Sequence, residues 1–209
     1  SNRIVRLKEG RDRSLWLVTE QGHLVRFRDG TFTNYPFDNA QSAEGDIQLL
    51  VDSAGTVWVG EKHGLWSVRG DRVVPVGRET LDAPVTSIVQ RRDGTLAIGT
   101  GAAGLFRVTG DGRVTRTIAD PALLADTVLG MYEDAAGSLW IAGVRTLRSW
   151  RDRLEPVTLP NAEPIATSIG IYLLVQVPAT GALFAQVASH VYHIDSGTAT
   201  LVRDTANLG

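Results

Sequence analysis

Five charged or ionisable residues lie in the predicted connections between strands, where side chains can reach a ligand. Lys62 and His63 share one hairpin, and Arg145 lies in the matching hairpin of a later, similar segment. Glu44 and Asp82 lie in two longer connections that are rich in acidic residues and proline. Cations, an imidazole and carboxylates can together hydrogen-bond a polar ligand, and connecting loops carry a large share of binding residues. These five residues are the candidate ligand-binding set.

The four histidines are not expected to form a metal site. His23, His63 and His190 each stand just before the third predicted strand of a repeat, so neighbouring copies lie on the order of 10 Å or more apart. Zinc–imidazole bonds of about 2.1 Å cannot bridge that distance. His193 follows His190 by three residues, and strand alternation sends it to the opposite face. We therefore expect no metal ion, and the absence of cysteine excludes disulfides and thiolate chemistry.

Two patterns that suggest cofactor binding or catalysis have simpler explanations. Residues 99–104 match a dinucleotide-binding glycine pattern, but that motif must open a helix, and here it joins two predicted strands. Glu133 and Asp134 form an acidic pair, yet adjacent residues of a strand point in opposite directions. Hydrolytic carboxylates instead lie roughly 5 to 10 Å apart across a cleft. We therefore expect no cofactor and no catalytic residue in this chain.

A repeat that occurs five times positions the candidate residues. Each copy has a small residue, an apolar residue and an aromatic, then a short polar gap and an apolar pair; the clearest is Gly55–Gly60 followed by Gly64–Val68. A period of about 40 residues is typical of a β-propeller, in which each repeat forms one four-stranded blade. Spacings of 42, 39, 43 and 44 residues separate the equivalent positions Trp16, Trp58, Ala97, Trp140 and Phe184.

The period predicts an all-β fold, a β-propeller built of five four-stranded antiparallel blades. The five form either a complete five-bladed ring or part of a larger ring. We expect the large aromatics of the repeat to pack between blades, because aromatic side chains bury the most area per residue. In the second copy the predicted strands cover residues 47–51, 56–60, 65–69 and 72–76. We expect a single domain over residues 1–209, with repeats at about 3–36, 46–76, 85–118, 128–158 and 169–203.

Composition limits the classes of partner. The chain is 43% apolar and 21% charged, as is ordinary for a globular protein. Its net charge of −2 leaves no basic footprint for nucleic acid. No apolar run approaches the roughly 18 residues of a membrane helix. We therefore expect no nucleic-acid partner and no membrane span in this chain.

Two copies of the repeat carry a family resemblance. The segments Asp52–Trp66 and Asp134–Ile141 resemble the two-component regulator propeller repeat, an Asp-x-x-Gly-x-Leu-Trp-Ile-Gly-Thr phrase ahead of a Gly-Leu pair. The third copy departs from it, with Ala97 for the tryptophan and Arg91 for the leading aspartate. The resemblance implies a periplasmic or extracytoplasmic sensor region, fused to an output domain in a two-component or diguanylate cyclase receptor. It supplies scaffold motifs and no shared catalytic residues.

Three interpretations of function follow. The first is a non-catalytic sensor that binds a small molecule, glycan or peptide; a homodimer is a further expectation, because an open arc of blades can close on a second copy. The second is a propeller lyase or hydrolase acting at the channel mouth, although the predicted innermost strands 47–51 and 86–90 carry no histidine or acid. The third is a protein-interaction scaffold, for which Leu123-Leu124 in the predicted loop 120–127 is the main sign.

Overall fold

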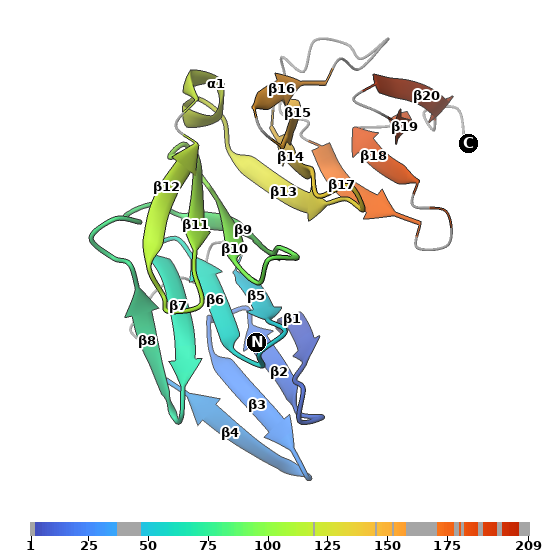
Figure 1. Ribbon diagram of the computed structural model, residues 1–209. Helices are drawn as coiled ribbons and strands as arrows, with labels where there is room; N and C mark the ends of the chain where they lie inside the picture. Colours follow the sequence, from blue (N-terminus) through green and yellow to red (C-terminus); the bar gives the residue numbers. More distant parts are fainter. Residues whose placement is uncertain are drawn as a thin grey trace. The chain divides into compact units, whose positions relative to one another are not determined.

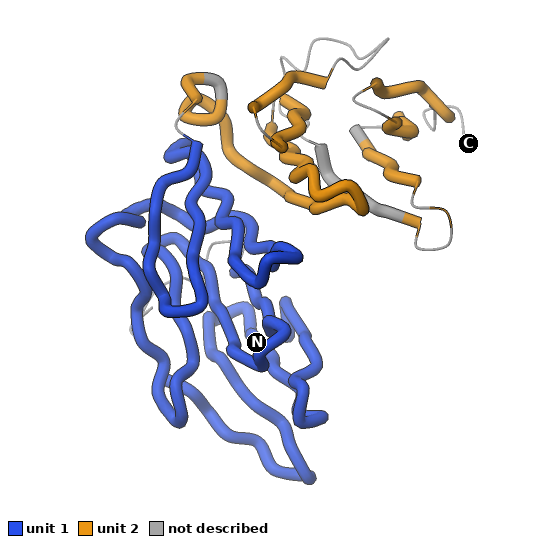
Figure 2. Tube along the Cα trace, viewed as in Figure 1, with its two compact units in different colours: residues 1–119 blue, residues 120–209 orange. Residues whose placement is uncertain are grey.

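The computed structural model describes residues 3–36, 47–118, 120–144, 146–151, 153–157, 171–177, 180, 182–187, 190–195 and 198–204. These residues form five four-stranded antiparallel sheets, and in each sheet the strands pair in chain order (Figure 1). The chain divides into two compact units, residues 1–119 and 120–209 (Figure 2).

The first unit holds three sheets. β1 lies beside β5, and β5 lies beside β9, so the first strands of successive sheets are neighbours, as the blades of a propeller require. The strands of the first sheet are β1 (Ile4–Glu9), β2 (Leu15–Thr19), β3 (Leu24–Arg28) and β4 (Thr31–Tyr35). Those of the second are β5 (Gln48–Val51), β6 (Val57–Glu61), β7 (Gly64–Arg69) and β8 (Arg72–Val76). Those of the third are β9 (Val85–Gln90), β10 (Leu96–Thr100), β11 (Leu105–Val108) and β12 (Val114–Ile118).

The second unit holds two sheets and a short helix, and its first strands, β13 and β17, are again neighbours. The helix is α1 (Pro121–Leu124). One sheet consists of β13 (Val128–Glu133), β14 (Leu139–Gly143), β15 (Leu147–Trp150) and β16 (Leu154–Pro156). The other consists of β17 (Ile171–Gln176), β18 (Leu183–Val187), β19 (His190–Asp195) and β20 (Thr198–Asp204).

In the hairpins β5–β6 and β13–β14, the leading aspartate of the repeat accepts the hydrogen bonds that close the turn. Asp52 Oδ1 accepts the N–H groups of Ala54 at 2.9 Å and of Thr56 at 2.8 Å. Its Oδ2 accepts the indole N–H of Trp58 at 2.8 Å. The leading aspartate and the tryptophan of the motif therefore form one hydrogen-bonded corner, which explains their spacing. The same three bonds join Asp134 to Ala136, Ser138 and Trp140.

Trp16, Trp58 and Trp140 are buried and pack between consecutive sheets, which confirms the role predicted for them. Burial of a large aromatic removes the most apolar surface from water per residue, so these side chains dominate the packing. Three shared clusters pair Trp16 with Leu49, Trp58 with Leu96, and Trp140 with Leu183. Phe184 is only partly buried and contacts His193 of its own sheet.

The strands match the predicted repeats closely. The connection before β13 differs from the loop that was predicted there. Each set of four strands falls within one predicted repeat, except that β20 ends one residue later, at Asp204. The segment expected to be a loop contains α1, because Pro121 suits a first helical position and the Asp120 carbonyl accepts the N–H of Leu123 at 3.0 Å. Leu123 is fully buried, so the interpretation of Leu123-Leu124 as an exposed apolar contact for a partner is wrong for Leu123. That the whole chain is one domain stays a prediction.

Candidate functional site

The β6–β7 hairpin presents Lys62 and His63 at its tip. Glu61 pairs with Gly64, so these two residues alone make the turn, and both are exposed. Gly64 has φ of +117°, and a Cβ atom there would lie 3.3 Å from the carbonyl oxygen of Leu81. Only glycine accepts this backbone without strain. The turn is therefore held against the connection that follows β8.

A buried carboxylate supports the tip. Glu61 is only 1% exposed, and its Oε1 accepts the indole N–H of Trp66 at 2.9 Å. Its Oε2 lies 3.9 Å from Nδ1 of His63, whose side chain is 48% exposed. That distance is longer than a hydrogen bond. Because a buried charge is costly unless it is hydrogen-bonded, the Trp66 contact fixes the carboxylate beneath the exposed imidazole.

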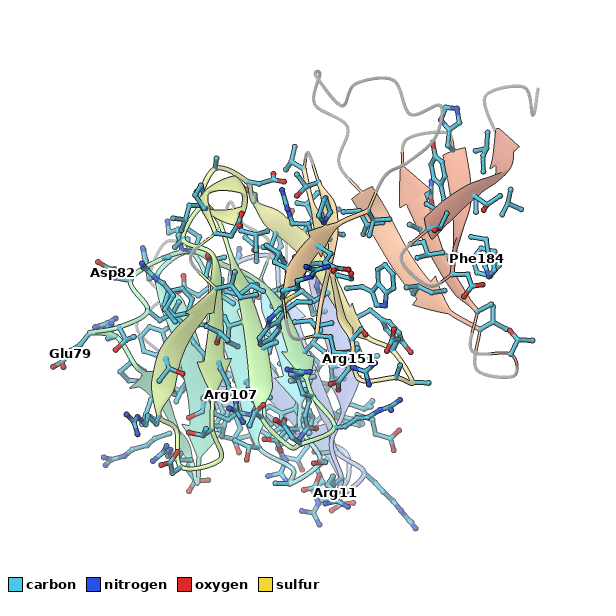
Figure 3. All side chains as sticks on the ribbon, turned by 45° about the horizontal axis from the view of Figure 1, so that its top comes forward. Arg11, Glu79, Asp82, Arg107, Arg151 and Phe184 are labelled. Atoms are coloured by element: carbon cyan, nitrogen blue, oxygen red, sulfur yellow. The ribbon has the colours of Figure 1, made fainter. Side chains whose placement is uncertain are left out.

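The connection between β8 and β9 borders the same hairpin. The guanidinium of Arg78 lies 5.1 Å from the ring centroid of Trp66, within the range of a cation–π contact. Leu81 is buried, and its N–H donates to the Gly77 carbonyl at 2.7 Å. Asp82 follows it and is exposed; its side chain points away from the sheets (Figure 3). Buried Leu81 thus holds Asp82 beside the hairpin.

The structure brings three of the five candidate residues to one end of the second sheet. Lys62 and His63 come from the β6–β7 turn, and Asp82 from the adjoining connection. Glu44 and Arg145 lie outside the described residues. These five stay predicted ligand contacts.

Sequence reasoning missed Glu61. The equivalent positions in two other sheets hold threonines that close the hairpin locally. Thr19 Oγ1 accepts the N–H of His23 at 3.1 Å, and Thr100 Oγ1 accepts the N–H of Ala103 at 3.1 Å. The signal in the sequence is a carboxylate in a column that otherwise holds Thr19, Thr100, Gly143 and Val187.

This end of the sheet is suited to polar ligands. Lys62 and Arg78 offer positive charge, His63 can donate and accept hydrogen bonds, and Asp82 accepts them. An imidazole beside a carboxylate is also the usual arrangement of a general acid or base. Within the described part of the chain, no three His, Asp or Glu residues converge as metal ligands.

No family model and no curated protein matches the chain. Many solved structures do match its fold. Virginiamycin B lyase from Staphylococcus aureus is 13% identical, with a TM-score of 0.78 over 97% of this chain and 70% of that one. The extracellular domain of BT4673 from B. thetaiotaomicron, assigned as a one-component system, is 14% identical, with a TM-score of 0.77 over 99% of this chain and 29% of that one.

A third match is the extracellular domain of BT3049, assigned as a hybrid two-component system of B. thetaiotaomicron. It is 18% identical, with a TM-score of 0.67 over 92% of this chain and 27% of that one. This chain therefore spans less than a third of the length of either of these two extracellular domains. At these identities the likeness shows the fold alone, which is that of β-propellers.

The comparisons correct one expectation. We expected a chain without enzymatic activity, because its repeats are scaffold motifs. The lyase is an enzyme, and it shares the fold over nearly the whole of this chain at 13% identity. Scaffold repeats therefore say nothing against catalysis, since loops and strand ends carry the chemistry. What the structure and the comparisons together establish is an all-β chain of five four-stranded antiparallel sheets with the fold of β-propellers.

Proposed function

We propose that this chain is a ligand-binding propeller in the extracytoplasmic input region of a signalling receptor, and that its ligand contacts Lys62, His63 and Asp82. The observation that carries the proposal is the buried Glu61 carboxylate beneath the exposed His63. A buried charge adds little to stability, and threonine closes the equivalent hairpins at Thr19 and Thr100. The Oε1 of Glu61 is bonded to Trp66, and we propose that its Oε2, 3.9 Å from His63, orients the imidazole for a ligand.

The ligand is a small molecule, a glycan or a peptide with several polar groups. Lys62 and His63 on the hairpin, with Arg78 and Asp82 on the adjoining connection, suit a molecule that both donates and accepts hydrogen bonds. Glu44 and Arg145 are proposed members of the same set from their positions in the sequence.

Placement outside the cytoplasm is supported by two of the matching structures, which are extracellular domains of assigned signalling proteins. No helix among the described residues is long and apolar enough to cross a bilayer. We propose that a fused output domain receives the signal. The ligand would act by binding one of two arrangements of the propeller more tightly, because a ligand shifts an equilibrium only by its differential affinity.

Whether the five sheets form a complete ring or part of a larger one is also a proposal. The molar mass of the chain, measured by light scattering on a sizing column, separates the two alternatives. A monomer of 22.5 kDa supports a closed five-bladed ring. A dimer supports an open arc that pairs with a second copy or belongs to a larger ring, because an open arc leaves bare sheet faces.

The binding proposal is tested by titrating the chain with a panel of sugars and short peptides, using calorimetry. For any compound that binds, His63→Ala and Lys62→Ala are expected to weaken binding about tenfold or more, as loss of a charged or charge-assisted hydrogen bond does. The matched control is His23→Ala, which changes the corresponding hairpin between β2 and β3 and should leave binding unchanged. Equal binding to wild type and to both variants would place the ligand elsewhere.

A second candidate function is that of a lyase. It is favoured by the pairing of His63 with Glu61, which resembles a base and its orienting carboxylate, and by the likeness to virginiamycin B lyase. One matching structure is an inactive lyase variant with quinupristin, so this compound is the first substrate to try. A new product peak on chromatography, lost in both His63→Ala and Glu61→Gln, would support it. Unchanged quinupristin after long incubation would argue against that substrate.

A further inference from the structure

A cavity lies between the second and third sheets, at the opposite end of β6 from Glu61. It has a volume of about 460 Å³, within the range of roughly 300 to 1,000 Å³ typical of ligand pockets. Ser67 lines it and is fully buried. The Ser67 hydroxyl has no hydrogen-bond partner among the described residues. A buried hydroxyl without a partner is costly, so a group that enters the cavity and bonds to it would relieve that cost.

The other sheets of the first unit carry an arginine at the equivalent position. Ser67 pairs with Trp58 across the strands, and the residues in the same register are Arg26 and Arg107. Those arginines pair with aspartates at their own corners, Asp12 and Asp93. The corner of the second sheet has Ala54 in that place. The second sheet therefore lacks the ion pair that its neighbours have at this place.

The cavity is bounded by side chains that join the two sheets. Gln90 of β9 accepts the N–H of Ser53 at 2.7 Å, and its amide nitrogen donates to the Ser53 hydroxyl at 2.8 Å. Arg69 of β7 extends to the turn after β11, where its guanidinium nitrogen lies 3.1 Å from the position of a Cβ atom on Gly112. The two hydrogen bonds of Gln90 therefore join the walls of the cavity.

The charges of the residues that line the cavity argue against an anionic ligand. Asp52 and Asp111 both line the cavity, against the single guanidinium of Arg69. The pKa of Asp111 is lowered, mainly by the hydrogen bond from the Thr109 hydroxyl, so this carboxylate is ionised at neutral pH. Hydroxyl groups can donate to carboxylates and accept from a guanidinium. An uncharged molecule with several hydroxyl groups satisfies both signs of charge.

Apolar residues complete the floor. Trp58, Leu96 and Val108 line the inner part of the cavity beside Ser67. A sugar ring has C–H groups that pack on such a surface and hydroxyls that reach the polar rim. We propose that this cavity binds a small uncharged polyhydroxylated ligand, a monosaccharide or cyclic polyol, with one hydroxyl on Ser67 and others toward Arg69 and Asp111. This site is separate from the one formed by Lys62 and His63.

Ligand-observed NMR on the 209-residue chain tests this with glucose, galactose and myo-inositol as probes, and with glucuronate as the anionic comparison. We expect at least one neutral probe to bind and glucuronate to bind more weakly. Ser67→Ala should weaken binding about two- to tenfold, the effect of one lost hydrogen bond. Arg69→Ala, an exposed change that spares the fold, should weaken it by a similar factor.

The double variant Ala54→Asp/Ser67→Arg copies the aspartate–arginine pair of the neighbouring sheets into the cavity. It is expected to abolish binding while the chain stays folded, because each new charge has a partner. The matched control is Ala136→Asp/Ser149→Arg, the same exchange in the sheet β13–β16, which should leave binding intact; His63→Ala should also leave it intact. The proposal is overturned if no neutral probe binds, if the filled cavity still binds, or if a crystal structure shows only a water on Ser67.

Discussion

The β5–β6 and β9–β10 hairpins turn the chain through the same corner with the aspartate at different positions. In the first, Asp52 stands at the start of the turn and accepts the Trp58 indole. In the second, Arg91 stands there instead, and Asp93 accepts the N–H of Thr95 at 2.9 Å and its hydroxyl at 2.6 Å. One corner is closed by a tryptophan, and the other by a threonine.

The difference extends to the third strand of each sheet. Trp58 pairs with Ser67, whereas Ala97 pairs with Arg107, whose guanidinium reaches Asp93 at 3.2 Å. Asp52 therefore receives an indole N–H, whereas Asp93 receives a threonine hydroxyl and a guanidinium. The larger side chain of the pair is therefore Trp58 on the second strand in one sheet and Arg107 on the third strand in the other. The third copy, which departs from the repeat motif, thus closes the same corner with a different set of hydrogen bonds.

Removing the tryptophan should have the largest effect. Trp58→Ala deletes the wedge between two sheets and leaves Asp52 without its indole partner, so we expect a loss of about 3–5 kcal/mol in the free energy of unfolding. Urea denaturation followed by circular dichroism measures it. Trp140→Ala, with the same partner geometry at Asp134, is the parallel case and should cost a similar amount. A loss below about 1 kcal/mol at both sites would show that the corner, rather than the aromatic, carries the packing.

Removing the aspartate should cost less. Asp52→Ala leaves two backbone N–H groups and one indole N–H without their acceptor, and we expect a loss of about 2–3 kcal/mol. Adding Ala54→Asp moves the carboxylate to the position that Asp93 occupies, with Thr56 in the place of Thr95. The double variant should therefore recover about 1 kcal/mol in the same denaturation experiment. No recovery would mean that the two corners are not interchangeable.

The repeat predicted the fold because its signals are local. The Asp52–Trp58 phrase encodes a turn, a strand and an aromatic wedge within seven residues, and the 39- to 44-residue period gave the number of sheets. The pattern did not predict α1, because four helical residues carry no periodicity and Pro121 also suits a loop. For the same reason the pattern did not predict that Leu123 is buried.

The candidate site was only partly visible in the sequence. Lys62 and His63 could be placed because a hairpin tip follows from the strand pattern alone. Burial of Glu61 could not, since it depends on Trp66 of the next strand and on the connection that carries Arg78. The cavity at Ser67 could not be predicted either, because it depends on how the sheets pack. Ser67 stands where the first and third sheets have Arg26 and Arg107.

Acid should weaken the first sheet through the carboxyl group of Asp12. The pKa of Asp12 is lowered from 3.8 to about 2, mainly by the hydrogen bond from the Ser14 hydroxyl, with the Arg26 charge a smaller contribution. A carboxyl whose pKa is lower when folded adds stability above about pH 4, and that stability is lost as the pH falls toward 2. The side chain is 40% exposed, so solvent screening limits the effect to about 1 kcal/mol.

Asp12→Asn should remove that pH-dependent component, as measured by denaturation midpoints between neutral and acidic pH. Asp29→Asn is the control, because this carboxylate is 88% exposed and forms an ion pair with Arg28 at 3.3 Å. Its midpoints should follow those of the wild type. A pH profile of Asp12→Asn that matches the wild type would exclude Asp12 as the titrating group.

The smallest expected effect separates the two donors of the Asp93 corner. Arg107 and Asp93 are joined at 3.2 Å, but their side chains are 45% and 50% exposed, and exposed ion pairs contribute about 0.5 kcal/mol or less. Arg107→Ala should therefore barely change the denaturation midpoint, and high salt should erase the difference. Thr95→Val, which removes the hydroxyl bonded to the same carboxylate, should cost about 1 kcal/mol whatever the salt concentration. The reverse order would mean that the arginine closes this corner as the indole closes its counterpart, and that an arginine placed at Ser67 would stabilise the second sheet.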